Sequence, residues 1–259
     1  MAVAKFKREY TTVRRAEGWG SADAAYYRAL PYRDLSGRFP HIWRIRARSY
    51  DVFIGRVVEP IERRAPVPLR ILDLGAGSGW LANRLALRGH SVLAIDLLDD
   101  PLDGLGAARH YGATFAALIA EFDHLPVPAN QTDLVVFNAS LHYSTNYVRT
   151  LRESLRVLHR DGTLVILDSP MYIDPTSGAR MVQERRARFM ATYGFASDAL
   201  PSEHYLTSAR LDALARELGI AWRVYRPGLD WRSGLSRAIG GLRARREPAS
   251  FPVITGTLK

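Results

Sequence analysis

The feature of this sequence that most constrains its fold is an apolar run that meets an acid and then three closely spaced glycines. Residues 71–80 read Ile-Leu-Asp-Leu-Gly-Ala-Gly-Ser-Gly-Trp. Glycines let the backbone turn sharply or lie directly against a ligand, so this order predicts a strand, a tight loop and a helix. The helix should run from Trp80 to Leu87 and end at a glycine cap, Gly89. The amide groups exposed at its start suit an anionic or polar part of a cofactor.

The alternation of strand and helix continues after this loop. Apolar runs predict four further strands, and a helical pattern separates the last two: the strands are Ser91–Asp96, Ala113–Ile119, Asp133–Asn138 and Thr163–Leu167, and the helix is Asn146–Leu158. Asp161-Gly162 is expected to form the turn into the last of these strands. Strands that alternate with helices and are apolar throughout predict an α/β fold with a parallel sheet covered on both faces.

We expect four regions along the chain: a helical arm or lid at 1–67, a cofactor-binding core at 68–170, an inserted cap segment at 171–206 and a C-terminal part at 207–259 that completes the sheet. The arm contains an amphipathic helical pattern over His41–Val58. Arg46 is among the arginines expected on the polar face of that helix, and Pro60 is the first of several prolines that punctuate the link to the core.

Beyond residue 170 the pattern is less regular. A basic helix is expected over Arg180–Tyr193, followed by a loop over Gly194–Tyr205. Thr207 is the expected N-cap of a helix that Gly219 ends. The remaining expected elements are strands at Ala221–Arg226 and Phe251–Leu258, with a helix within the arginine-rich segment Trp231–Arg246.

Composition limits the class of protein. The 259 residues are 47% hydrophobic, which is enough for a substantial core, and no window approaches the roughly 18 uninterrupted apolar residues of a membrane span. The absence of cysteine excludes disulfides, thiolate metal sites and cysteine nucleophiles. The N-terminus lacks an apolar signal segment, so a cytoplasmic location is expected.

The net charge of +10 is unevenly distributed: it is +8 in residues 1–70, −4 in residues 71–170 and +6 in residues 171–259. Basic flanks around an acidic centre suit an anionic partner. However, 33 of the 36 basic residues are arginine, and genome composition explains that bias as readily as selection for anion binding.

The spacing of the glycines separates three kinds of cofactor. A dinucleotide site requires Gly-x-Gly-x-x-Gly, and Trp80 occupies the place of its last glycine. A phosphate loop requires Gly-Lys-Ser/Thr, and no lysine lies nearby. Polar residues also follow successive predicted strands, at the edge of the sheet where ligands bind in such folds: Asp73, Asp96, Glu121, Asn138 and Asp168.

Together these motifs resemble those of the class I S-adenosylmethionine-dependent methyltransferases, particularly the small-molecule subfamily related to the quinone-biosynthesis methyltransferases. The resemblance spans roughly residues 68–168, in which residues 73–79 resemble the family's Asp-x-Gly-x-Gly-x-Gly and Asp96 resembles the acid ending its second strand. Residues 120–128 resemble its Gly-Asp-Ala-Glu-x-Leu-Pro-Phe-x, with Ala120 and Glu121 replacing glycine and aspartate. The resemblance implies a Rossmann-like seven-stranded, mostly parallel sheet with helices on both faces, an N-terminal helical arm and an insertion after the fifth strand.

The resemblance also implies a cofactor, S-adenosylmethionine, and the residues that would hold it. Asp73 would favour the ammonium group of the ligand, Asp96 would accept from both ribose hydroxyls, and Glu121 would accept from the adenine amino group. The full expected set is Asp73, Gly75, Ala76, Gly77, Gly79, Asp96, Leu97, Glu121, Phe122 and Asn138.

His142 is the candidate general base, because it follows the fourth strand where the transferred methyl group should point. A packing role explains this residue equally well, and His204 in the inserted segment is a second candidate. No histidine–carboxylate spacing indicates a metal, and the acids Asp99, Asp100 and Asp103 are expected to form a solvated turn.

The predicted function is methyl transfer from S-adenosylmethionine to an oxygen, nitrogen or carbon atom of a small-molecule acceptor by in-line displacement. The basic flanks would suit an anionic acceptor. Two alternatives stay open. An RNA methyltransferase acting on tRNA or rRNA would bind phosphates through the basic flanks, although the signature Asn/Asp-Pro-Pro-Tyr is absent after Asn138. A non-catalytic S-adenosylmethionine-binding protein would keep the pocket without turnover.

Overall fold

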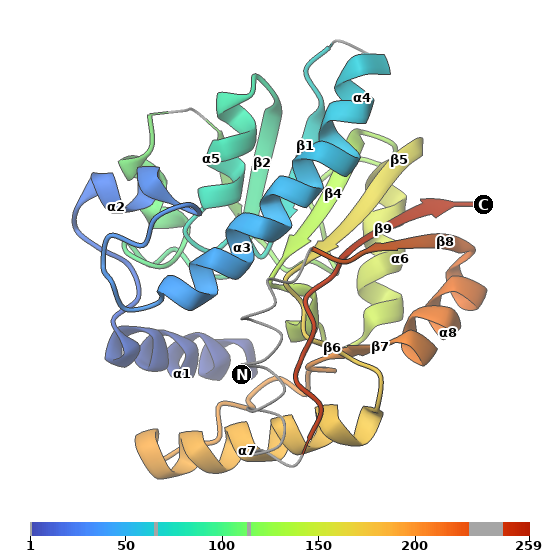
Figure 1. Cartoon of the computed structure of the whole chain (residues 1–259). Helices are drawn as coiled ribbons and strands as arrows, with labels where there is room; N and C mark the ends of the chain where they lie inside the picture. The colour runs from blue at the N-terminus through green and yellow to red at the C-terminus, as the bar shows by residue number, and fades with distance from the viewer. Residues whose placement is uncertain (1, 65–66, 113–114, 228–245) are drawn as a thin grey trace.

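A seven-stranded sheet forms the centre of the molecule in the computed structural model, which describes residues 2–64, 67–112, 115–227 and 246–259 (Figure 1). Its strands lie in the order β3-β2-β1-β4-β5-β9-β8. Five of them run parallel: β1 (Arg70–Leu74), β2 (Ser91–Asp96), β3 (Ala116–Ile119), β4 (Thr132–Asn138) and β5 (Leu158–Leu167). β9 (Val253–Leu258) runs antiparallel between β5 and β8 (Ile220–Tyr225). The predicted seven-stranded, mostly parallel α/β sheet is confirmed.

Helices cover both faces of this sheet. One face carries α2 (Ala24–Ala29), α3 (Pro40–Phe53) and α5 (Trp80–Leu87), and the other carries α6 (Tyr147–Val157) and α8 (Ser208–Leu218). Successive strand residues point to opposite faces, so β1 buries Ile71 in one hydrophobic cluster and Leu72 in the other. Both faces of the central strands are therefore closed to water, which explains their continuous apolar sequences.

Two helices lie across the same end of the sheet, as Figure 1 shows: α1 (Ala2–Glu17) from the N-terminal arm and α7 (Pro175–Tyr193) from the segment after β5. The short strands β6 (Met171–Tyr172) and β7 (Leu206–Thr207) pair in parallel. The segment between them, which contains α7, therefore begins and ends at the same point of the fold. The expected N-terminal arm and the insertion after the fifth strand are both present. A 3-10 turn, Leu141–Tyr143, follows β4, and a second one, Leu105–His110, lies between β2 and β3 in the chain.

The helix expected over His41–Val58 is longer than predicted. It begins at Pro40 and continues through a π-helical turn, Ile54–Val58, into α4 (Glu59–Arg64), so Pro60 lies within the helix and not in the link. A proline removes one backbone hydrogen bond and crowds the carbonyl four residues earlier. The wider π turn directly before α4 accommodates both effects.

The fifth strand begins at Leu158, so Asp161-Gly162 is part of β5 and the prediction of a turn there was wrong. The pairing of β5 with β4 is irregular between Thr132 and Leu134. A Cβ atom at Gly162 would lie 2.9 Å from Leu158 Cδ2 and 3.2 Å from the carbonyl oxygen of Asp133. Glycine therefore allows the two strands to approach closely at this irregularity.

The helix α7 starts at Pro175, five residues before the predicted Arg180. Asp174 caps it by accepting from the Thr176 amide, and Pro175 occupies the first turn, where a missing N–H is harmless. The predicted helix over Trp231–Arg246 lies outside the described residues apart from Arg246, and so does Ala113 at the expected start of the third strand. Within the described ranges, no helix is both long and apolar enough to span a bilayer.

Candidate active site

The glycine loop after β1 forms the floor of the candidate site. The amides of Gly75 and Ala76 donate to the Ile95 carbonyl over 2.7 and 3.1 Å, which ties the loop to β2. Gly75 has φ +71°, and a Cβ atom there would lie only 2.3 Å from Ser140 Cβ. Gly77 also has positive φ, but a Cβ atom there would meet no described atom within 4 Å. At Gly75 the loop therefore lies directly against the residues that follow β4, whereas at Gly77 its backbone is open.

A cavity of about 130 Å³ lies above this loop at the carboxyl ends of the parallel strands. Asp96 ends β2 and accepts from the amides of Gly77 and Leu98, each over 2.8 Å. Burial raises the pKa of Asp96. Six of the ten predicted cofactor residues line this cavity: Gly75, Gly77, Asp96, Leu97, Glu121 and Phe122.

A second cavity of about 60 Å³ adjoins the first and shares Gly75, Gly77 and Ala139 with it. It holds two more predicted residues, Ala76 and Asn138. Asn138 is buried, and its side-chain oxygen has no hydrogen-bond partner in the described part of the chain. The loop thus lies between the larger cavity and the smaller one. The smaller cavity contains a buried hydrogen-bond acceptor, the side-chain oxygen of Asn138, that has no described partner.

Two predicted cofactor residues line neither cavity. Gly79 is the N-cap of α5, where a Cβ atom would lie 2.9 Å from the Phe115 ring. Asp73 is fully buried in β1, and neither of its oxygens has a side-chain partner among the described residues. Burial, and secondarily the charge of Asp96, raise the pKa of Asp73 to about 7. Asp73 thus lies in the strand that leads into the loop and lines neither cavity.

The helix α1 covers the larger cavity with the side chains of Val3, Phe6 and Tyr10. Arg14 attaches this helix to the body of the protein through a bidentate pair with Asp103, whose Nη2–Oδ1 contact is 2.8 Å. Arg15 pairs with Asp100 over 2.8 Å. The expectation that Asp100 and Asp103 form a solvated turn was wrong, because these acids anchor the N-terminal helix.

Sequence reasoning missed two arginines of the smaller cavity, Arg14 and Arg46. Arg46 was expected on the solvent face of its helix, but its guanidinium lies 4.7 Å from the Trp43 ring centroid and faces the cavity. The spacing of three residues from the buried Trp43 is the signal that could have placed it inward. Phe6, Tyr10 and Val13, at spacings of four and three, would likewise have indicated an apolar face on α1.

His142, the candidate base, is half-buried beside the larger cavity, and it is not among the residues that line either cavity. Its Nδ1 lies 3.5 Å from Ser169 Oγ, and its ring centroid lies 4.4 Å from that of Tyr143. Burial and then the nearby charge of Arg185 lower the pKa of His142 to about 3. A base this weak takes up a proton poorly, so the geometry gives no support to general-base catalysis by His142.

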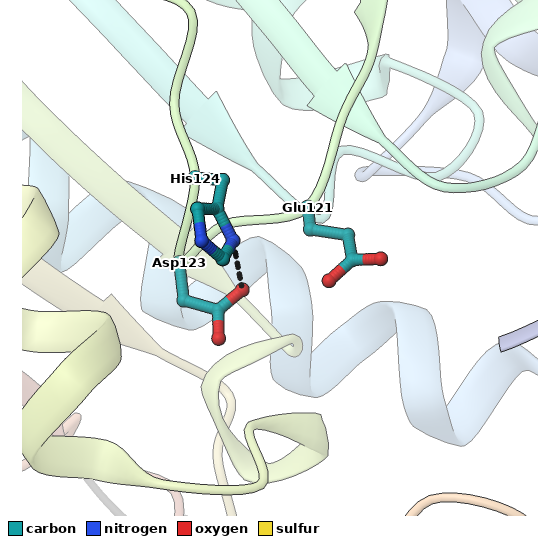
Figure 2. A group of neighbouring side chains, drawn as sticks. All are labelled: Glu121, Asp123 and His124. Atoms are coloured by element: carbon teal, nitrogen blue, oxygen red, sulfur yellow. Dashed lines mark ion pairs between the residues drawn. The ribbon is translucent and has the colours of Figure 1, made fainter. Parts of the chain in front are cut away.

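Glu121, Asp123 and His124 have side-chain oxygen and nitrogen atoms within 4.8 Å of one another, and Figure 2 shows Asp123 and His124 facing each other with Glu121 to one side. His124 Nδ1 lies 3.6 Å from Asp123 Oδ1. Arg149 already approaches both, at 3.1 Å from Asp123 Oδ2 and 2.8 Å from His124 Nε2. A guanidinium at this position disfavours a bound cation, so we assign no metal to the group.

Comparisons with known proteins find methyltransferases that are similar to the centre of the chain. Residues 72–166 match the family described as a methyltransferase domain. An uncharacterized methyltransferase of Mycobacterium tuberculosis is 37% identical over 95 residues, which are 37% of each chain. A malonyl-[acyl-carrier protein] O-methyltransferase of Geobacter sulfurreducens is 42% identical over 126 residues, covering 45% of this chain and 47% of that protein. The chain thus matches less than half the length of these curated relatives.

Solved structures share the fold over a longer span. An S-adenosylmethionine-dependent methyltransferase of Thermotoga maritima, described as a possible histamine N-methyltransferase, has a TM-score of 0.54 and 16% identity over 90% of this chain and 98% of that one. An S-adenosylmethionine-dependent methyltransferase of Mesorhizobium loti has a TM-score of 0.54 and 21% identity over 73% of this chain and 90% of that one. At these identities the likeness concerns the fold.

Proposed function

We propose that this chain, whose residues 72–166 match a methyltransferase domain family, is a class I S-adenosylmethionine-dependent methyltransferase and transfers a methyl group from S-adenosylmethionine to an oxygen, nitrogen or carbon atom of a small-molecule acceptor. The observation that carries the proposal is the pair of adjoining cavities above the glycine loop. They gather eight of the ten residues predicted from the family motifs at one end of the sheet. We also propose that the chain belongs to the small-molecule subfamily related to the quinone-biosynthesis methyltransferases.

The larger cavity suits the adenosine part of the cofactor. Asp96 keeps lone pairs free beyond the two amides that it accepts from, so it can also accept from ribose hydroxyls. Glu121 and Phe122 line the same cavity and would face the adenine, with the glutamate accepting from its amino group. Leu97, which also lines this cavity, would supply an apolar wall between the ribose and the adenine.

The smaller cavity suits the amino-acid end of the cofactor. The unpartnered side-chain oxygen of Asn138 would accept from the ammonium group. Arg46 would bind the carboxylate, because no described acid lies within 4 Å of its guanidinium. Asp73 would act from behind the loop as a positioning residue for its backbone.

Methyl transfer requires alignment and the exclusion of water more than proton transfer. When bound, S-adenosylmethionine supplies an electrophilic methyl group on a positively charged sulfur. The chain's own contribution is to orient the donor through the strand-end residues and to cover it with Phe6 and Tyr10 of α1. We assign no general base, since the pKa of His142 is held near 3.

Calorimetric titration with S-adenosylmethionine tests the cofactor assignment. The parent protein should bind, and Asp96→Ala should bind roughly 10- to 100-fold more weakly, because the ribose loses a charged acceptor. Asp99→Ala is the matched control, since Asp99 is exposed three residues along the same segment. If the parent protein does not bind, the proposed function is wrong.

A labelled methyl donor incubated with a small-molecule metabolite extract tests turnover. Transfer of label to a small molecule supports the proposal and excludes a purely cofactor-binding protein. Binding of S-adenosylmethionine without transfer to any extract would instead favour the non-catalytic alternative.

A further inference from the structure

Three residues from separate elements are linked by hydrogen bonds near the turn after β4. Arg185 comes from α7, His204 precedes β7, and His142 follows β4. The Nη2 of Arg185 lies 3.0 Å from His204 Nδ1, and the His204 amide donates to the His142 carbonyl over 3.0 Å. We refer to Arg185, His204 and His142 as the cap cluster.

The charge of Arg185 has no acidic partner in the part of the chain that the structure describes: no carboxylate lies within 4 Å of it there, and its Nε is buried without a hydrogen-bond partner. The acids near it in sequence are already used. Asp198 pairs with Arg186 at 3.3 Å, and Glu184 pairs with Arg246 at 2.8 Å. Partial burial of a guanidinium without a counter-charge costs free energy, and an anionic ligand would offset that cost.

The two histidines carry no negative charge, so they neither neutralise Arg185 nor compete with an anion for its guanidinium. Burial, with the charge of Arg185 next, lowers the pKa of His142 to about 3 and that of His204 to about 4. Both imidazoles are therefore neutral at physiological pH. A neutral imidazole offers one N–H donor, so the cap cluster presents donors and one fixed positive charge.

The backbone of the cap cluster is fixed in a strained conformation. His204 has φ +67°, a left-handed value that a non-glycine residue rarely adopts. Its neighbours are attached to the turn after β4: the Glu203 amide donates to the Ser144 carbonyl over 3.0 Å, and Ser202 Oγ donates to the Tyr143 carbonyl over 2.9 Å. Arg210 then clamps the Glu203 carboxylate with contacts of 2.8 and 2.7 Å. Strain of this kind persists where surrounding contacts hold it in place, and it concentrates at ligand sites.

Tyr143 connects the cap cluster to the cofactor cavity. Its side chain lines the larger cavity, and its ring centroid lies 4.4 Å from that of His142. Leu200, from the same loop as His204, lines that cavity too. A molecule in the cavity next to Tyr143 would therefore lie close to the cap cluster.

We propose that the methyl acceptor carries an anionic group, a carboxylate in its simplest form, which the guanidinium of Arg185 binds with donors from His142 and His204. This inference rests on the proposed function, because it names the substrate class of the same site. Arg185 is a specificity-determining residue in this scheme, and the methyl group is transferred at another atom of the acceptor.

Fractionation of a metabolite extract on an anion-exchange resin tests the charge of the acceptor. Labelled methyl transfer should be confined to the retained, anionic fraction, and the labelled product should itself remain anionic. With that fraction as substrate, Arg185→Gln should lower kcat/KM roughly 10- to 100-fold, and Arg185→Lys should restore part of it. Arg188→Gln, on the exposed side of the same helix, removes an equal charge and should leave the rate unchanged.

S-adenosylmethionine affinity separates this inference from the proposed function, because both Arg185 variants should bind the cofactor as the parent does. Transfer confined to the neutral or cationic fraction, or equal rates for Arg185→Gln and Arg188→Gln, would overturn the inference and leave the methyltransferase assignment intact.

A binding test that needs no turnover uses benzoate and its neutral counterpart benzamide as probes, at constant ionic strength and with the cofactor product S-adenosylhomocysteine present. Benzoate should raise the melting temperature of the parent and of Arg188→Gln, and it should lose this effect in Arg185→Gln. Equal shifts with benzoate and benzamide would contradict an anion site at Arg185.

Discussion

At the scale of single residues, Asp73 is a carboxylic acid that the fold keeps from water. Its pKa is about 7 in the folded protein, whereas an unfolded chain releases the same proton near pH 4. Between these values the folded state holds a proton that the unfolded state has lost, so stability falls as the pH rises. The slope from this single group is at most about 1.4 kcal/mol per pH unit.

The variant Asp73→Asn cannot ionise and should escape this loss. We expect its free energy of unfolding, relative to that of the parent, to increase between pH 5 and pH 8, measured by urea denaturation without cofactor. The comparison cancels the contributions of titrating groups that do not interact with Asp73. A difference between the two proteins that is the same at every pH would show that Asp73 does not titrate in this range.

The residues of the site were predictable to different degrees for a physical reason. Gly75, Gly77 and Asp96 belong to short local patterns, because the turn and the strand end that they build are local structures. Arg14 and Arg46 come from helices far from the loop in sequence, and a helical pattern read alone places most arginines in solvent. Only the packing of those helices against the sheet end turns their guanidinium groups inward.

At the scale of elements, α1 depends on a charge pair for its position over the cavity. In Asp103→Asn the partly buried guanidinium of Arg14 loses its counter-charge, which should weaken the docking of α1 by about 1–2 kcal/mol. Hydrogen exchange of residues 2–17 should become several-fold faster, while exchange in α6 stays unchanged. Asp99→Asn, at an exposed neighbouring position, serves as the control.

Unchanged exchange in residues 2–17 of Asp103→Asn would mean that the apolar contacts of Phe6 and Tyr10 hold the helix without the pair.

Element boundaries were less predictable than element types, and the causes are specific. Pro60 was read as a helix breaker, but the π turn before it absorbs the missing hydrogen bond. Asp161-Gly162 has the composition of a turn, yet these residues lie within β5, at the irregularity in its pairing with β4. In both places a non-local or unusual hydrogen-bond pattern overrides the local preference.

At the scale of the whole molecule, the net charge of +10 is the feature that favours a nucleic-acid acceptor. Ion pairs such as Arg88 with Glu62 and Arg210 with Glu203 leave this net charge unchanged, but they make those arginines less available to phosphates. For a small acceptor, we expect kcat/KM to change only a few-fold between 50 and 200 mM salt. Binding to a phosphate backbone through several contacts should instead weaken by orders of magnitude over this range.

Assays of methyl transfer and of binding to a tRNA mixture at the two salt concentrations make this comparison. Transfer to tRNA with a steep salt dependence would replace the small-molecule proposal with the nucleic-acid alternative.

The order of the sheet also sets an order of assembly. β8 pairs with β9 and has no other partner in the described sheet, while β9 lies between β8 and β5. β8 therefore cannot join the sheet until residues 253–258 have been synthesised, although it precedes them in the chain. Until then β5, a strand of the hydrophobic centre, offers an open edge of backbone donors and acceptors to any other strand. A nascent chain is most exposed to misassembly at this stage, after its cofactor-binding motifs have already been made.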